Sequence, residues 1–179
     1  MRTVSLLIVS AALPVGAFAQ ITVGASLTIQ DPEASCTVLS TTDLDYGTLI
    51  RPTTGSGLTI DMDEVDGTMT ASTGLTVPTG YEVGAISVQA QNTSNLTIST
   101  TFPSDLDNLS YTGAWAISED ATSGYATITG TSHTVSGLGG VGGDATRYYR
   151  FGGEVGDIGS ATALGTYDAD ISLAITCTQ

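Results

Sequence analysis

The stretch YDADISLAITC, residues 167–177, alternates apolar and polar side chains over eleven consecutive positions. Such alternation is typical of a β-strand with one buried face, because successive side chains point to opposite sides of a strand. The apolar series ends in Cys177, and the chain has one other cysteine, Cys36, near its beginning. The pattern therefore predicts that the first and last structured segments are tied together.

The first 19 residues have the features of a cleaved secretory signal peptide. Arg2 precedes the apolar run 6–13, and Ala17-Phe18-Ala19 supplies small residues around an aromatic. We expect mature protein to begin at Gln20; a membrane anchor would need about 20 apolar residues. In an oxidising compartment, two cysteines favour a disulfide over a metal site or a redox motif. The alternative is a pair of free or intermolecular thiols.

Composition and charge limit the partners. The 179 residues include 18 acidic residues, 4 arginines and no lysine, giving a formal net charge of −14. Such a surface repels the phosphate backbone, so we expect no nucleic acid partner. No second apolar run follows the signal peptide, so we expect a soluble mature chain without membrane insertion. The length suits one domain with its own core.

The mature chain is predicted to be all-β. No segment shows a period of 3.6 residues, whereas short alternating runs rich in Thr, Ser, Val and Ile are separated by Gly, Asn, Asp and Pro. We expect many short strands in one domain, hence a sandwich or barrel. The alternating runs on either side of 92–95 predict a hairpin with both inward faces assigned. The expected strands are 21–29, 35–40, 43–50, 57–62, 68–72, 84–91, 95–102, 113–119, 124–130, 146–155 and 166–177.

The glycine-rich segment 137–143 contains the spacing G-x-G-x-x-G found in dinucleotide-binding folds. That motif requires a strand before it and a helix after it. Here residues 144–146 lead directly into another strand pattern. We therefore interpret the segment as a loop and expect no nucleotide cofactor.

The sequence offers no convincing catalytic site. A catalytic triad needs a base held by a third group, and the only histidine, His133, lies in a polar run where we expect an exposed or turn position. One histidine and two paired cysteines provide no zinc ligand set. Carboxylates are plentiful, but no spacing singles out a pair. We expect no enzyme activity and no cofactor.

Asp61, Asp63 and Asp66 are weak metal candidates, because carboxylates and a glycine crowd together at 61–67. The register does not fit an EF-hand, since loop positions 5, 6 and 12 would be Val65, Asp66 and Ser72. An acidic hairpin turn is the favoured interpretation, and weak calcium binding is the alternative.

Three pieces in order along the chain resemble a family of secreted proteins. They are Cys36-Thr37-Val38 followed by the strand 44–49 with Leu44-Asp45-Tyr46-Gly47, the hairpin strands 84–102, and the ending 165–173 that begins Gly165-Thr166-Tyr167; the sister family named below also shares Tyr149-Arg150-Phe151-Gly152-Gly153. Over residues 34–177 they resemble bacterial β-sandwich proteins of the spore coat protein U and archaic chaperone-usher pilin type, and a sister family of uncharacterised pilin-like domains. The resemblance implies an immunoglobulin-like fold and, for the pilins, polymerisation by donor-strand exchange.

In donor-strand exchange, the N-terminal extension of one subunit fills a groove in the next. The segment 20–32 is a suitable extension that precedes a sandwich domain at 33–179. Its donor residues would be the apolar alternation Ile21, Val23, Ala25, Leu27 and Ile29. Alternatively, residues 21–29 complete their own sandwich. A first-to-last disulfide is a departure from familiar pilins and would be expected to narrow the acceptor groove.

We therefore expect a structural subunit of an extracellular bacterial fibre or surface layer, exported through the periplasm to the cell surface. Its partners would be copies of itself in a head-to-tail polymer, together with a periplasmic chaperone and an outer-membrane usher. The alternative is a self-contained secreted binding module that recognises carbohydrate through exposed Tyr111, Trp115 or Tyr125. Those aromatics are otherwise half-buried strand residues.

Overall fold

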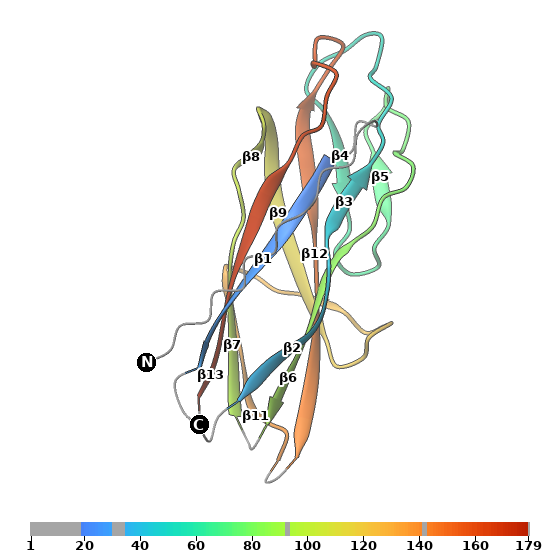
Figure 1. The fold of residues 1–179 in the computed structure, drawn as a ribbon. Helices are drawn as coiled ribbons and strands as arrows, with labels where there is room; N and C mark the ends of the chain where they lie inside the picture. Colours follow the sequence, from blue (N-terminus) through green and yellow to red (C-terminus); the bar gives the residue numbers. More distant parts are fainter. Residues whose placement is uncertain (1–18, 30–34, 92–93, 141–142, 179) are drawn as a thin grey trace.

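The protein is an all-β sandwich of two facing sheets, as Figure 1 shows. This computed structural model describes residues 19–29, 35–91, 94–140 and 143–178. The predicted signal peptide lies outside the described residues, except for Ala19. The described part contains thirteen strands and no helix, which confirms the predicted fold class. It therefore has no helix long and apolar enough to cross a lipid bilayer.

Sheet A contains five strands in the spatial order β11-β7-β13-β1-β3. Their bounds are β1 (Ala19–Ile29), β3 (Leu44–Gly47), β7 (Ser94–Thr101), β11 (Ser132–Leu138) and β13 (Ala169–Thr178). Neighbouring strands run antiparallel with one exception, because β1 runs parallel to β13.

Sheet B contains eight strands around the long strand β12. Their bounds are β2 (Cys36–Thr42), β4 (Leu58–Met62), β5 (Met69–Ala71), β6 (Gly84–Gln91), β8 (Asp105–Leu106), β9 (Leu109–Ser118), β10 (Ala126–Thr127) and β12 (Asp144–Ile158). One edge of β12 pairs with β9, while the other pairs first with β6 and then with β4. The strand predicted at 124–130 is reduced to the two residues of β10.

Two glycines allow β12 to change partners. A Cβ at Gly152 would lie 2.3 Å from the carbonyl oxygen of Met62, and Gly153 has a φ of +125°. Only glycine adopts that backbone conformation without strain and permits such a close approach. The Gly-Gly pair therefore marks the point where the edge of β12 passes from β6 to β4.

The predicted hairpin at 84–102 is wrong, although its inward faces are right. Ile86 and Val88 of β6 are buried, as are Leu96 and Ile98 of β7. However, β6 belongs to sheet B and β7 to sheet A, so the chain crosses between the sheets instead of turning back on itself. Alternation fixes which face of a strand is buried, but it does not specify the neighbouring strand.

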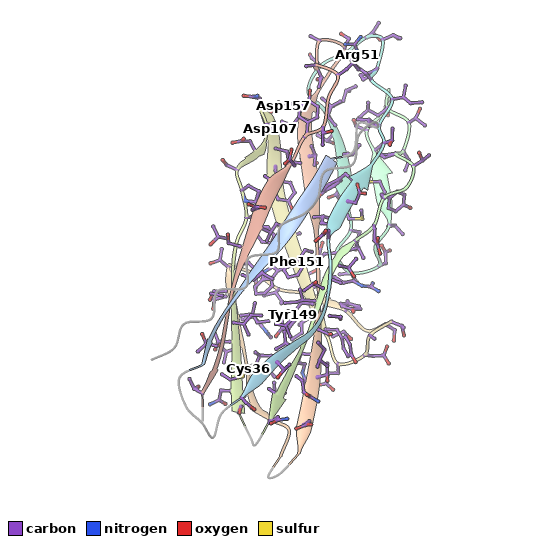
Figure 2. The ribbon with its side chains drawn as sticks, viewed as in Figure 1. Cys36, Arg51, Asp107, Tyr149, Phe151 and Asp157 are labelled. Atoms are coloured by element: carbon purple, nitrogen blue, oxygen red, sulfur yellow. A yellow bond between two sulfur atoms is a disulfide. The ribbon has the colours of Figure 1, made fainter. Side chains whose placement is uncertain are left out.

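The core between the sheets is centred on aromatic side chains of sheet B. Trp115 lies nearly parallel to Tyr149 and Phe151, with ring centroids 6.0 and 6.4 Å away. All three rings are at most 1% exposed. Figure 2 shows Tyr149 and Phe151 in the middle of the molecule, with Cys36 toward one end and Arg51 at the other. The two ends therefore differ chemically: one carries the disulfide and the other an arginine.

Candidate assembly interface

The N-terminal strand β1 lies between β13 and β3 of its own chain. It pairs in parallel with β13 at nine consecutive positions, from Ile21 opposite Ala169 to Ile29 opposite Cys177. Its other edge pairs with β3 only at residues 19–21. In the described residues, β1 is therefore attached to the sandwich mainly through β13.

The register places the predicted donor residues opposite the inward-facing positions of β13. Val23 is aligned with Ile171, and Leu27 with Ile175. Ile171, Leu173 and Ile175 are at most 2% exposed, which confirms the buried face predicted for this strand. The apolar positions of β1 are thus aligned with the apolar positions of β13 along the paired segment.

On the edge of β1 opposite β13 lies the Leu-Asp-Tyr-Gly strand, β3. Leu44 is fully buried, and Tyr46 is 1% exposed. The Tyr46 hydroxyl donates a 2.7 Å hydrogen bond to the carbonyl oxygen of Gly153, and burial raises the pKa of Tyr46 well above its ordinary value. Gly47 ends the strand with a φ of +72°, and a Cβ there would lie 2.4 Å from the carbonyl oxygen of Thr79. Each apolar or glycine position of the motif therefore has a packing role.

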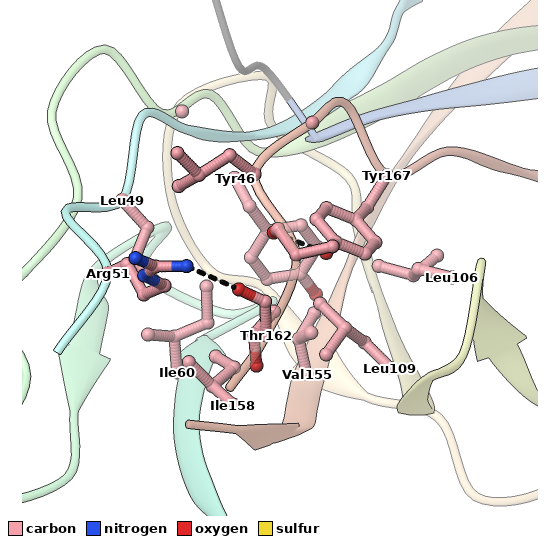
Figure 3. A pocket seen from close by; sticks show the side chains of 14 residues that line it. Tyr46, Leu49, Arg51, Ile60, Leu106, Leu109, Val155, Ile158, Thr162 and Tyr167 are labelled. Carbon is pink, nitrogen blue, oxygen red and sulfur yellow. Dashed lines mark hydrogen bonds between the residues drawn. The ribbon is translucent and has the colours of Figure 1, made fainter. Parts of the chain in front are cut away.

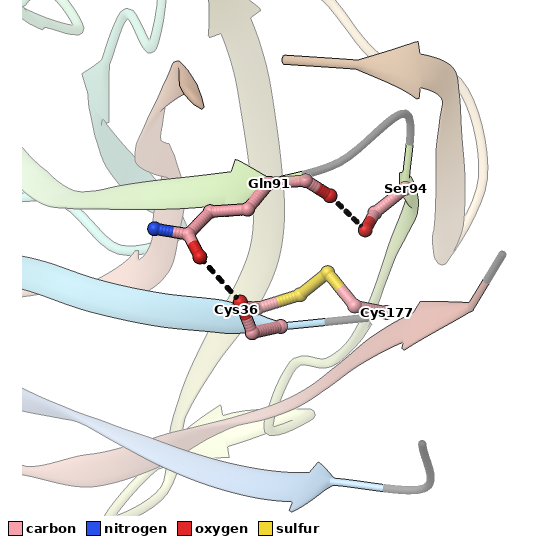
Figure 4. The surroundings of a disulfide bond; sticks show 5 residues. Cys36, Gln91, Ser94 and Cys177 are labelled. Carbon is pink, nitrogen blue, oxygen red and sulfur yellow. Dashed lines mark hydrogen bonds between the residues drawn. A yellow bond between two sulfur atoms is a disulfide. The ribbon is translucent and has the colours of Figure 1, made fainter. Parts of the chain in front are cut away.

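A disulfide between Cys36 and Cys177 joins β2 of sheet B to β13 of sheet A, as predicted. The two Cα atoms are 5.8 Å apart, and both residues are buried. Figure 4 shows the bond beside Gln91, whose Oε1 accepts a 2.9 Å hydrogen bond from the Ser35 hydroxyl. The bond coexists with the full pairing of β1, since Ile29 is aligned with Cys177 itself. In this chain the bridge therefore leaves the outer edge of β13 able to pair along its whole length.

The acidic segment 61–67 begins at the end of β4 and continues into the turn before β5. Asp63 accepts backbone hydrogen bonds from Val65 and Asp66, at 2.7 and 3.1 Å. Asp66 accepts hydrogen bonds from the backbone and hydroxyl of Thr68, which lower its pKa. These two carboxylates cap the turn, and the described residues include no group of three His, Cys, Asp or Glu placed to hold a metal ion.

Asp61 precedes the turn and lies on strand β4. It is aligned with Glu154 of β12. Partial burial, followed by repulsion from Glu154, raises the pKa of the Asp61 carboxyl. Asp61 therefore lies in a strand while Asp63 and Asp66 lie in the turn, and the three weak metal candidates do not form one ligand set.

His133 is not in an exposed turn, so that prediction is wrong. It lies within β11, a strand the sequence pattern did not predict, and is half-buried. Its ring packs edge-on against Trp115 and Tyr149, both at 6.5 Å, and its Nδ1 atom is buried without a hydrogen-bond partner in the described residues. Burial lowers the pKa of this imidazole.

The aromatics suggested for carbohydrate recognition are mostly inside the sandwich. Tyr111 is 5% exposed and Trp115 is 1% exposed, so these two rings are not the exposed side chains that the carbohydrate-binding alternative needs, and they are buried more deeply than the half-buried positions otherwise expected. Tyr125 is partly exposed, but the guanidinium of Arg150 covers its ring at 3.9 Å. These three side chains therefore do not present one open stacking surface.

No protein-family model matches the chain, and no curated protein matches it. The resemblance to pilin-like proteins thus stays an expectation drawn from the sequence motifs.

Proposed function

We propose that this protein is a structural subunit of an extracellular bacterial fibre that assembles by donor-strand exchange, with β1 as the donor strand and the β13 edge as the acceptor. The observation that carries the proposal is the orientation of β1. It forms the one parallel pair among the strand pairs of the described residues, while all the others are antiparallel.

Parallel pairing is slightly less stable per residue than antiparallel pairing. A strand from a neighbouring subunit could enter beside β13 in the antiparallel direction. Reversal about the centre, where Ala25 faces Leu173, keeps each odd-numbered residue of β1 opposite an odd-numbered residue of β13. The apolar alternation of β1 would then stay aligned with the inward-facing residues of β13, so the sequence of β1 suits both arrangements.

The attachment of β1 also suits exchange. Six residues, 30–35, separate Ile29 from Cys36. An extended segment of that length reaches roughly 20–25 Å. The donor strand could therefore leave its own subunit while the disulfide keeps β2 and β13 together. A heterologous contact of this kind that does not close into a ring produces an open filament.

Cysteine cross-linking tests which chain supplies β1. Ser26 is aligned with Ala174 in the parallel register, and reversal about the centre would place it opposite Ser172. Ala174 and Ser172 are exposed. Single variants Ser26→Cys, Ala174→Cys and Ser172→Cys would be purified, mixed in pairs under polymerising conditions and oxidised, and the double variant Ser26→Cys/Ala174→Cys would report pairing within one chain.

We expect Ser26→Cys to form an intermolecular disulfide with Ser172→Cys, and polymers to accumulate. A cross-link with Ala174→Cys between chains would show exchange in the parallel direction. The control Thr134→Cys places an exposed cysteine on β11, away from β1, and should not react with Ser26→Cys. If cross-links form only within the double variant and the full chain stays monomeric at high concentration, β1 completes its own sandwich and the proposal is wrong.

Two further variants address the donor strand itself. Deleting residues 20–30 should give a monomer that folds when a matching peptide is supplied but does not polymerise. Leu27→Asp should have nearly the same effect, because an unpaired charge in an apolar position costs several kcal/mol. A deletion that lowers the melting temperature without changing the oligomeric state would contradict the proposal.

A further inference from the structure

An apolar pocket of about 80 Å³ opens at the end of the sandwich opposite the disulfide. One wall comes from sheet B and the β8–β9 hairpin, and the other from the end of β3 and the loop before β13, as Figure 3 shows. The side chains that line it include Tyr46, Arg51, Leu106, Leu109, Leu164 and Tyr167.

The deep part of the pocket is lined by apolar side chains and by hydroxyl groups that already have hydrogen-bond partners. Leu106 is fully buried and Leu109 is 9% exposed. The two tyrosine hydroxyl protons are already used, since Tyr46 donates to the carbonyl of Gly153 and Tyr167 donates to the carbonyl of Ala163, at 2.7 and 2.6 Å. The inner surface therefore suits an apolar group.

Arg51 is the charged side chain of the lining. Its Nη1 donates a 3.3 Å hydrogen bond to the carbonyl oxygen of Thr162. In the described part of the chain, no carboxylate lies within 4.0 Å of its guanidinium. By contrast, Arg147 pairs with Glu119 at 2.7 Å, and Arg150 lies over the ring of Tyr125.

An arginine without a carboxylate partner among the described residues is informative in a chain with 18 acidic residues and 4 basic ones. A guanidinium is always charged and binds carboxylates through two parallel hydrogen bonds. Among the lining residues, Leu164 is 77% exposed, so the apolar lining extends to the surface of the protein.

We propose that this pocket binds a carboxylate carried next to a short apolar group, with Arg51 holding the carboxylate and the leucine-lined pocket taking the apolar part. The volume sets the size of that part. A cavity of about 150 Å³ accommodates benzene, and this pocket, at about 80 Å³, has roughly half that volume. A free aliphatic acid of roughly four to six carbons, or an apolar C-terminal residue of a peptide, has this chemistry.

Binding would be measured by NMR titration of the full mature chain with hexanoate, acetate and hexylammonium. The peptide Gly-Gly-Leu would be added with a free and with an amidated C-terminus. We expect saturable shifts around Leu49, Arg51 and Leu164 with hexanoate or with the free-acid peptide. Acetate lacks the apolar chain, while hexylammonium and the amidated peptide lack the carboxylate, so these three should not saturate.

Binding of hexanoate alone identifies a free acid as the ligand, and binding of the free-acid peptide alone identifies a protein C-terminus. No saturation by either below about 10 mM, or equal binding of hexylammonium, overturns the proposal.

Two variants separate the charge from the cavity. Arg51→Gln should weaken binding at least about tenfold, the effect of losing one charge-assisted hydrogen bond. Arg147→Gln removes the same charge elsewhere and should leave affinity unchanged. Gly165→Leu should occlude the pocket without a backbone clash, because nothing lies within 4 Å of a Cβ at Gly165. Binding unaffected by both Arg51→Gln and Gly165→Leu would contradict the assignment.

Discussion

Breaking the Cys36–Cys177 bond should lower the stability of the sandwich by several kcal/mol. The bond closes a loop with a sequence separation of 141 residues. Loop-closure entropy for that length corresponds to roughly 5 kcal/mol at 25 °C. For a domain of this size, 1 kcal/mol shifts the melting temperature by about 2–4 °C. Reduction should therefore lower the melting temperature by roughly 10–20 °C.

The assay is thermal unfolding followed by circular dichroism, on the oxidised protein, the reduced protein and the variant Cys36→Ala/Cys177→Ala. Reduction keeps both side chains in place, so it isolates the effect of the covalent link. The double variant adds lost packing, because both cysteines are at most 5% exposed. It should therefore melt below the reduced wild type.

Hydrogen exchange provides a local readout of the same perturbation. The bond joins the first residue of β2 to the end of β13. Reduction should accelerate exchange most at 36–42 and 174–178, and least in the centre of β12. A decrease in melting temperature smaller than about 3 °C, with uniform exchange, would refute the loop-entropy argument and show that the unfolded chain gains little freedom.

The remaining predictions concern groups inside the sandwich and the acidic turn. Because burial lowers the pKa of His133 below its unfolded value of about 6.5, its contribution to stability is complete above that pH and is lost as pH falls through the folded pKa. The melting temperature should therefore decline more between pH 7 and 5.5 in wild type than in His133→Phe, and equal slopes would contradict this. The buried hydroxyl of Tyr149 has no partner in the described residues, so Tyr149→Phe should leave stability unchanged or raise it by up to about 2 kcal/mol, measured by urea unfolding; a clear loss would reveal a partner such as a buried water. Since carboxylates in 61–66 cap a turn, calcium chelation at constant ionic strength should not change the melting temperature, whereas a rise of several degrees in millimolar calcium would show a specific site.

The sequence predicted strand faces well because burial leaves a period of two in the residues themselves. The alternation at 167–177 identified Ile171, Leu173 and Ile175 as inward-facing, and each is buried. The same signal carries no information about partners, which explains the error at 84–102. Pairing depends on which edges meet after the chain has crossed between sheets, and that is a property of the whole sandwich.

Strand β11 was missed for a different reason. The run 132–138 is dominated by Ser, Thr and Gly, and its side chains are mostly exposed. An edge strand of this kind buries little apolar surface, so its hydrophobic pattern is weak. The strand is held instead by its pairing with β7 and by hydroxyl contacts such as Thr97 with Thr134, at 2.9 Å. Because β11 was missed, His133 was also placed in the wrong environment.

For the candidate site, the two features that can be predicted are the donor alternation and the disulfide. The donor alternation is a short local pattern in the sequence. The disulfide follows from the presence of only two cysteines in the chain. The position of β1 between β13 and β3 is not local, since it joins segments more than a hundred residues apart. The pocket around Arg51 is equally non-local, and its sequence signal is limited to a lone arginine after Leu49-Ile50 in an acidic chain.

The balance between a closed monomer and a fibre depends on small differences, because each subunit in a polymer both gives and receives one β1 strand. The apolar residues of β1 that are aligned with the inward-facing positions of β13 are then the same in both states, so their burial would not by itself drive exchange. Association costs an estimated 4–15 kcal/mol in translational and rotational freedom at the 1 M standard state. What remains in favour of the fibre is the gain from antiparallel over parallel pairing across nine positions, together with contacts between subunits outside the strand. If the donated strand also entered in the parallel direction, that gain would vanish. The direction of β1 in the oxidised polymer, reported by Ser172→Cys against Ala174→Cys, is therefore the measurement that decides whether strand pairing itself can drive assembly.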